Sequence, residues 1–120
     1  MTAQGSAHAR FSRALATGNP TLVLAAASEL GQLGLADALA VTLVLLAGDG
    51  DRFDRAAVRW HARWCLEARP GADESQLALA ALLALRGAAR QAAADALIEL
   101  LESRGPRAAA RVLSGWVERA

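Results

Sequence analysis

The sequence predicts an all-α fold, a compact bundle or short stack of about seven antiparallel helices. Residues that favour helix, above all alanine, leucine, arginine and glutamate, dominate the 120-residue chain. The polar–apolar alternation that marks half-buried strands is missing. Glycine, proline and capping residues divide the chain into segments of helical length, joined by short connections. Consecutive helices are therefore expected to pack antiparallel as hairpins.

Three helices are expected in the first part of the chain, over residues 6–17, 20–30 and 35–47. Gly18 ends the first helix. Asn19 is a strong N-cap residue, and Pro20 fits the first position of the second helix. Gly31 and Gly48 are the stop signals of the second and third helices.

Four further helices are expected over residues 51–69, 73–86, 88–103 and 106–118. Asp51 is expected to cap the fourth helix, which Pro70 ends. Asp73, followed three residues later by Gln76, resembles a capping box and predicts the start of the fifth. Gly105 separates the last two helices.

Two of the expected helices, residues 35–46 and 77–85, are apolar on nearly every side. Such helices lie at the centre of a fold or are covered by a partner. The other helices are amphipathic. Large side chains are few, and these five are expected to anchor the core: Phe11, Phe53, Trp60, Trp64 and Trp116.

The length predicts a single domain over residues 1–120, with residues 1–6 as a flexible N-terminus. Cys65 is the only cysteine, which fits a reducing compartment. Residues 1–5 lack the basic start of a secretory signal. The longest apolar run, residues 35–47, is too short to span a bilayer. We therefore expect a cytoplasmic protein that does not bind membranes.

Residues with the chemistry for catalysis are sparse. His61 and Cys65, at i and i+4, share one side of a helix. Two ligands are too few for zinc, and a nucleophile needs an orienting third group. Cys65 is expected to be a small buried apolar residue and His61 to be partly exposed. Residues 48–54 (GDGDRFD) fail as a calcium loop because Asp54 stands where glycine is needed. The sequence predicts no enzyme activity, no cofactor and no metal site.

The fourth expected helix carries two distinct faces. Four arginines, which we call the arginine stripe, fall within an arc of roughly 80°: Arg52, Arg55, Arg59 and Arg63. An aromatic seam lies nearly opposite, within about 60°. It consists of Phe53, Ala57, Trp60 and Trp64. The seam is expected to face the core and the stripe to face outward.

Three interpretations of the stripe stay open. It is a solvated face, partly neutralised by Asp51, Glu67, Glu99 and Glu102; it docks an acidic protein; or it binds the phosphates of a nucleic acid. A net charge of only +1 argues against a general nucleic-acid-binding protein. We therefore expect a small protein-interaction or adaptor module, or a protein that self-associates, with nucleic-acid binding by the same stripe as the alternative.

Residues 14–30 (ALATGNPTLVLAAASEL) resemble a helical-hairpin repeat of the tetratricopeptide type. Gly18 and Asn19 stand at the turn, and residues 25–27 supply a small-residue surface for a second helix. The resemblance covers one hairpin, without a 34-residue period along the chain. It implies stacked helical hairpins and a partner-binding scaffold.

Overall fold

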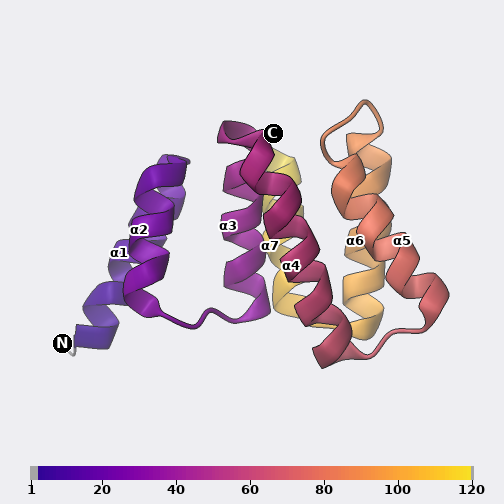
Figure 1. Ribbon diagram of the computed structural model, residues 1–120, viewed down its shortest axis with the longest axis horizontal. Coiled ribbons are helices and arrows are strands. Elements are labelled where there is room, and N and C mark those ends of the chain that lie inside the picture. Colours follow the sequence, from indigo (N-terminus) through magenta and orange to yellow (C-terminus); the bar gives the residue numbers. More distant parts are fainter. Residues whose placement is uncertain (1–2, 120) are drawn as a thin grey trace.

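The computed structural model describes residues 3–119, which form seven α-helices and no strand (Figure 1). The helices are α1 (Ala3–Thr17), α2 (Pro20–Leu30), α3 (Leu35–Gly48), α4 (Gly50–Ala68), α5 (Ala72–Ala84), α6 (Arg90–Arg104) and α7 (Arg107–Arg119). The predicted all-α class is confirmed. Helix α1 includes residues 3–6, which we expected to belong to a flexible tail, and residues 1 and 2 lie outside the described part.

Helix α3 lies at the centre of the molecule and packs against α4, α7 and α2. The α1–α2 hairpin forms one end of the molecule and the α5–α6 hairpin forms the other. The last helix, α7, runs back toward the centre and lies beside α3 (Figure 1). Residues 35–46, one of the two apolar segments expected to be either central or covered by a partner, thus lie centrally. Residues 77–84 instead belong to an outer helix: within the described chain α5 packs mainly against α4 and α6, and Leu77 is 50% exposed.

Two clusters of apolar side chains fill the interior. The main core runs through α3 to α7 and contains Phe53, Trp60 and Trp64. A smaller cluster around Phe11 and Val41 attaches the α1–α2 hairpin to α3. Four of the five predicted core anchors are buried. Trp116 is only partly buried: it lines a groove together with residues of α1 and α3. The Arg90 guanidinium of α6 lies 5.3 Å from its ring centroid.

The N-cap predicted from the sequence is the observed one at α2, whereas the observed N-caps of α4 and α5 differ from the predicted ones. The Asn19 side chain accepts hydrogen bonds from the backbone N–H groups of Thr21 and Leu22 at 3.0 and 3.3 Å, as the sequence predicts. At α4 the cap is Asp49 rather than Asp51, because the extended backbone at Asp49 lets the helix begin at Gly50.

At α5 the predicted pair of Asp73 and Gln76 is also shifted. The helix begins at Ala72, and the Glu74 side chain reaches back to accept a hydrogen bond from Gly71 N–H at 2.9 Å. Glycine at the N-cap supplies no side chain, so Glu74 provides the reciprocal half of a capping box alone.

None of the described helices is both long and apolar enough to cross a lipid bilayer. The longest, α4, has 19 residues and carries the arginine stripe along its length. A polar face of this kind requires water or a polar partner.

Candidate functional site

The aromatic seam of α4 fixes how this helix is rotated about its axis. Trp60 and Trp64 are buried with their ring planes 7° from parallel and their centroids 6.4 Å apart. The indole N–H of Trp60 donates to the Leu35 carbonyl at 2.8 Å, and that of Trp64 donates to the Gly105 carbonyl at 2.8 Å. Because the seam is held inward from both α3 and the α6–α7 connection, the stripe is held outward.

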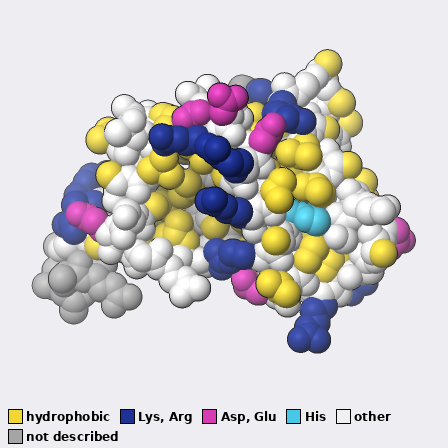
Figure 2. Space-filling view, in the orientation of Figure 1, with side chains coloured by type: hydrophobic (Ala, Val, Ile, Leu, Met, Phe, Trp, Pro, Cys, Tyr) yellow, Lys and Arg dark blue, Asp and Glu magenta, His cyan; other side chains and the backbone are white. Residues whose placement is uncertain are grey.

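All four stripe arginines line one groove of about 530 Å³ on the side of α4 that faces α2. Helix α3 packs against both α2 and α4 and forms the floor between them. The remaining lining is almost wholly apolar: Leu24, Ala38, Val41, Thr42, Leu45, Ala56 and Trp60. Figure 2 shows the dark-blue side chains in a row with apolar side chains on either side. We call this site the arginine groove. No carboxylate lines it.

The two ends of the stripe are neutralised locally. Arg52 Nε lies 3.2 Å from Asp49 Oδ2, and Arg63 Nη2 lies 3.3 Å from Glu67 Oε2. Among the four acids expected to neutralise the stripe, only Glu67 makes an ion pair with it in the described structure, and Asp49 takes the place of Asp51. Glu99 and Glu102 are on α6, which packs on α5 and α7 and not on the stripe.

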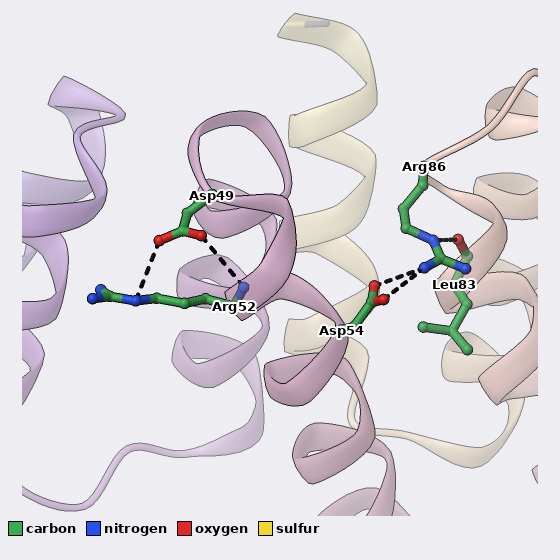
Figure 3. A network of polar contacts seen from close by, with 5 residues as sticks. All are labelled: Asp49, Arg52, Asp54, Leu83 and Arg86. Atoms are coloured by element: carbon green, nitrogen blue, oxygen red, sulfur yellow. Dashed lines mark hydrogen bonds and ion pairs between the residues drawn. The ribbon is translucent and has the colours of Figure 1, made fainter.

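Asp54, one turn from Asp49, is drawn to the other side of α4. Its two carboxylate oxygens each accept a hydrogen bond from Arg86 Nη1 at 2.8 Å, and Arg86 Nε donates to the Leu83 carbonyl at 2.8 Å. Figure 3 shows Asp49 and Asp54 pointing away from each other across α4. The Asp54 carboxylate thus pairs with Arg86 and links α4 to the end of α5, away from the groove.

The middle of the stripe has no such neutralisation. Arg55 and Arg59 are exposed, and neither makes a hydrogen bond or ion pair with another described residue. They stand one helical turn apart on the groove wall, so their charges repel by a few tenths of a kcal/mol. The groove thus offers two adjacent guanidinium groups to an anion.

His61 and Cys65 meet a third residue that the sequence did not indicate. Ser75 of α5 places its carbonyl oxygen 2.8 Å from His61 Nε2 and its hydroxyl 3.2 Å from Cys65 Sγ. Cys65 Sγ is also 3.5 Å from His61 Nε2. Since a carbonyl only accepts, Nε2 carries a proton and donates to it. The nitrogen nearest the thiol is therefore not free to remove its proton.

This cluster joins α4 to α5 and corrects one expectation. Cys65 is partly exposed and makes polar contacts, rather than being a buried apolar residue. Sequence spacing could not reveal Ser75, because its approach depends on how the α4–α5 hairpin closes. Within residues 3–119, no three His, Cys, Asp or Glu side chains are grouped so that they could hold a metal ion.

The shortest ion pair among the described residues lies away from the groove. Arg104 Nη2 is 2.7 Å from Glu74 Oε1, and Arg104 Nε donates to Oε2 at 2.9 Å. Hydrogen bonds from Arg104 and from Gly71 N–H lower the pKa of Glu74, and the carboxylate raises the pKa of Arg104. The pair ties the end of α6 to the start of α5.

No protein-family model, curated protein or solved structure matches the chain. Function is therefore inferred from the geometry of the arginine groove.

Proposed function

We propose that the protein is a small non-enzymatic interaction module that holds an acidic segment of a protein in the arginine groove. One observation carries this proposal. Arg55 and Arg59 stand without a partner in the described structure, on the wall of a groove whose floor is apolar and which contains no carboxylate. That combination suits a ligand with carboxylates on one side and apolar side chains on the other.

An acidic amphipathic helix has this chemistry. Its apolar side chains would lie on the floor beside Leu24 and Val41, in the manner of a helix held in a hydrophobic groove. Its carboxylates would accept paired hydrogen bonds from the guanidinium groups of Arg55 and Arg59. The charges would chiefly select the partner and speed its approach, and the apolar floor would supply most of the affinity.

Apolar side chains at the outer edge of α4 extend the docking surface. Val58 is 52% exposed and Leu66 is 77% exposed. By helical spacing Val58 lies beside the stripe, on the side away from the groove floor, whereas Leu66 continues the line of the stripe beyond Arg63. A partner would therefore meet apolar side chains on both sides of the arginines, which favours a docking surface over a merely solvated face.

Two further features support a scaffold over a catalyst. The α1–α2 hairpin, whose sequence resembles the tetratricopeptide type, supplies the far wall of the groove through Leu24. The proton on His61 Nε2 is engaged by the Ser75 carbonyl, which leaves Cys65 without a base at that nitrogen. The lone cysteine fits a cytoplasmic location for this module.

Nucleic-acid binding is the alternative for the same groove. The apolar floor favours a protein segment, because phosphates gain nothing from it. The net charge of +1 and the local pairing of Arg52 and Arg63 also leave few cations for a phosphate backbone. A nucleic acid is therefore the weaker candidate for this groove.

The test measures fluorescence anisotropy of a labelled synthetic amphipathic peptide that carries leucine on one face and glutamate on the other. The full chain is expected to bind this peptide and not the matching lysine peptide. Replacing Arg55→Glu together with Arg59→Glu is expected to weaken binding at least about tenfold, a loss of about 1.4 kcal/mol. Because both side chains are exposed and unpaired, the melting temperature should hardly change.

The matched control is Arg13→Glu with Arg119→Glu, which makes the same change of net charge at exposed arginines of α1 and α7. It should bind the peptide about as well as the natural chain. Equal weakening in the control and the groove variant would contradict the proposal. Tight binding of a labelled single-stranded DNA, lost steeply with added salt and with Arg59→Glu, would replace it by the nucleic-acid function.

A further inference from the structure

Helix α6 presents an acidic face to the surface. Asp95, Glu99 and Glu102 are exposed and fall within about 60° of one another around the helix. Asp95 accepts a hydrogen bond from Gln91 Nε2 at 2.9 Å, whereas Glu99 and Glu102 make no hydrogen bond or ion pair in the described structure. We call these three residues the acidic face.

The residues around the acidic face suit close approach by another surface. By helical spacing the small residues Ala92, Ala96 and Ser103 lie on one side of the acidic face, and Gln91 lies on the other. The arginines of α6 lie on the far side of the helix, where Arg90 stacks on Trp116 and Arg104 pairs with Glu74. Arg107 and Arg111 of α7 share a shallow pocket with Glu102 without forming an ion pair with it.

The acidic face matches the arginine groove in spacing and in charge. Its residues follow at intervals of four and three, and the stripe follows at intervals of three, four and four. Both elements leave two adjacent charges without an ion-pair partner: Glu99 and Glu102 on α6, Arg55 and Arg59 on α4. These two surfaces cannot meet within one molecule, because the groove opens between α2 and α4 whereas α6 lies in the hairpin at the other end (Figure 1).

We propose that the acidic occupant of the arginine groove is the acidic face of a second copy of this chain. This inference rests on the proposed function and names the partner of the same groove. Each copy offers one groove and one acidic face, which are different surfaces, so the contact is head-to-tail. Such contacts either close into a ring or extend with rising concentration.

The association has a defined chemistry. Carboxylates of Glu99 and Glu102 accept hydrogen bonds from Arg55 and Arg59, while the small side chains of Ala92 and Ala96 beside the acidic face let α6 approach the apolar floor. Exposed ion pairs contribute little each and are screened by salt. The association should therefore be weak and concentration-dependent, and should decline as the Debye length shortens from about 10 Å at 0.1 M salt to about 3 Å at 1 M.

The experiment uses light scattering after size-exclusion chromatography of the full chain, loaded at about 10 µM and at about 1 mM, where mass action favours association. The natural chain should rise above the monomer mass at the high concentration and return toward it in high salt. The groove variant, Arg55→Glu with Arg59→Glu, and the face variant, Glu99→Arg with Glu102→Arg, should each remain monomeric. All substituted residues are exposed, and circular dichroism verifies that each variant is folded.

Charge exchange gives the decisive comparison. A chain that carries all four substitutions restores opposite charges across the contact, so it should regain the concentration-dependent mass. An equimolar mixture of the groove and face variants should also associate. The control Arg13→Glu with Arg119→Glu should associate like the natural chain.

The outcomes separate this inference from the function on which it rests. A natural chain that stays monomeric, or a face variant that associates as well as it does, overturns the second copy as occupant. If that same monomeric chain still binds the glutamate peptide through Arg55 and Arg59, the proposed function stands with a different partner. If it binds neither, both proposals are wrong.

Discussion

Single side chains decide which way α4 faces, and Trp64 is one of the two that fix its rotation. Its ring is 0% exposed, and its N–H donates to the Gly105 carbonyl at 2.8 Å across 41 residues of chain. Trp60 makes the equivalent bond to Leu35. Packing of the aromatic seam alone would let α4 rotate or slide against its neighbours. The two hydrogen bonds fix the rotation of α4 about its axis, and so they position the stripe.

Replacing Trp64→Phe should lower the free energy of unfolding by about 2 kcal/mol. The substitution leaves the Gly105 carbonyl without its buried donor and removes part of the packed ring. Urea denaturation followed by circular dichroism measures the change. Trp116→Phe, at a half-buried ring with no described N–H bond, should cost clearly less. Equal losses in both variants would contradict the role given to Trp64.

The lowered pKa of Glu74 implies that the stability of the fold depends on pH. Its pKa is lowered first by the Arg104 hydrogen bond and then by Gly71 N–H. A carboxyl whose pKa is lower in the folded chain stabilises the fold above its unfolded pKa, and this contribution is lost as pH falls through the folded pKa. The melting temperatures of the natural chain and Glu74→Gln should therefore differ most near neutral pH and converge below about pH 4.

Thermal denaturation at a series of pH values provides this comparison. Glu118→Gln, which removes an exposed carboxylate with no described ion pair, controls for the change in net charge. A gap between the natural chain and Glu74→Gln that stays constant, or widens toward acid, would show that the Arg104 contact does not lower the pKa of Glu74.

At the scale of elements, the α1–α2 hairpin depends on how α2 begins. Asn19 satisfies the first free N–H groups of α2, and Pro20 occupies a position that needs no N–H. Arg10 and Glu29, 2.9 Å apart, join the middle of α1 to the end of α2. Since Leu24 of α2 lines the groove, the start of α2 also sets one groove wall.

Asn19→Ala should lower the free energy of unfolding by about 1 kcal/mol, because alanine supplies no cap. Asn19→Gly should cost only a few tenths of a kcal/mol, since glycine is tolerated at an N-cap. Urea denaturation of both variants gives the comparison. An alanine variant as stable as the glycine variant would mean that the side-chain cap contributes nothing in solution.

At the scale of the whole molecule, the close approach of α2 to the end of α3 holds the two parts together. A Cβ placed on Gly48 would lie 2.6 Å from Pro20 Cγ, whereas one on Gly50 would meet nothing within 4 Å. Proline is rigid and Pro20 is fixed at the start of α2, so the clash is relieved only by moving the helices apart. The hairpin attaches to α3 through a small cluster, which makes this contact important.

Gly48→Ala should destabilise the protein by about 1–2 kcal/mol, because the clash outweighs the gain in helix propensity. Gly50→Ala, two residues away and with open space around it, should be neutral or stabilise by up to about 1 kcal/mol. Thermal denaturation of the pair measures this difference. If both substitutions stabilise, α2 does not approach α3 as closely as described.

The helices and the two faces of α4 follow from local patterns in the amino-acid sequence. Helix punctuation such as Asn19–Pro20, and the 3.6-residue spacing of the seam and the stripe, are local features that need no distant contact. The predicted N-cap of α4, Asp51, is two residues from the observed one, Asp49. Both positions carry an aspartate close to the start of the helix, so the sequence alone does not distinguish them.

The surroundings of the stripe, by contrast, depend on packing between helices and could not be predicted from the sequence. Whether Arg55 and Arg59 lie in open solvent, against acids or over an apolar floor depends on where α2, α3 and α6 settle. The same holds for Ser75 beside Cys65, for Asp54 turned to Arg86, and for Glu99 and Glu102 placed far from the stripe. Spacing along one helix fixes directions around its axis, whereas packing between helices distant in sequence fixes which surfaces those directions meet.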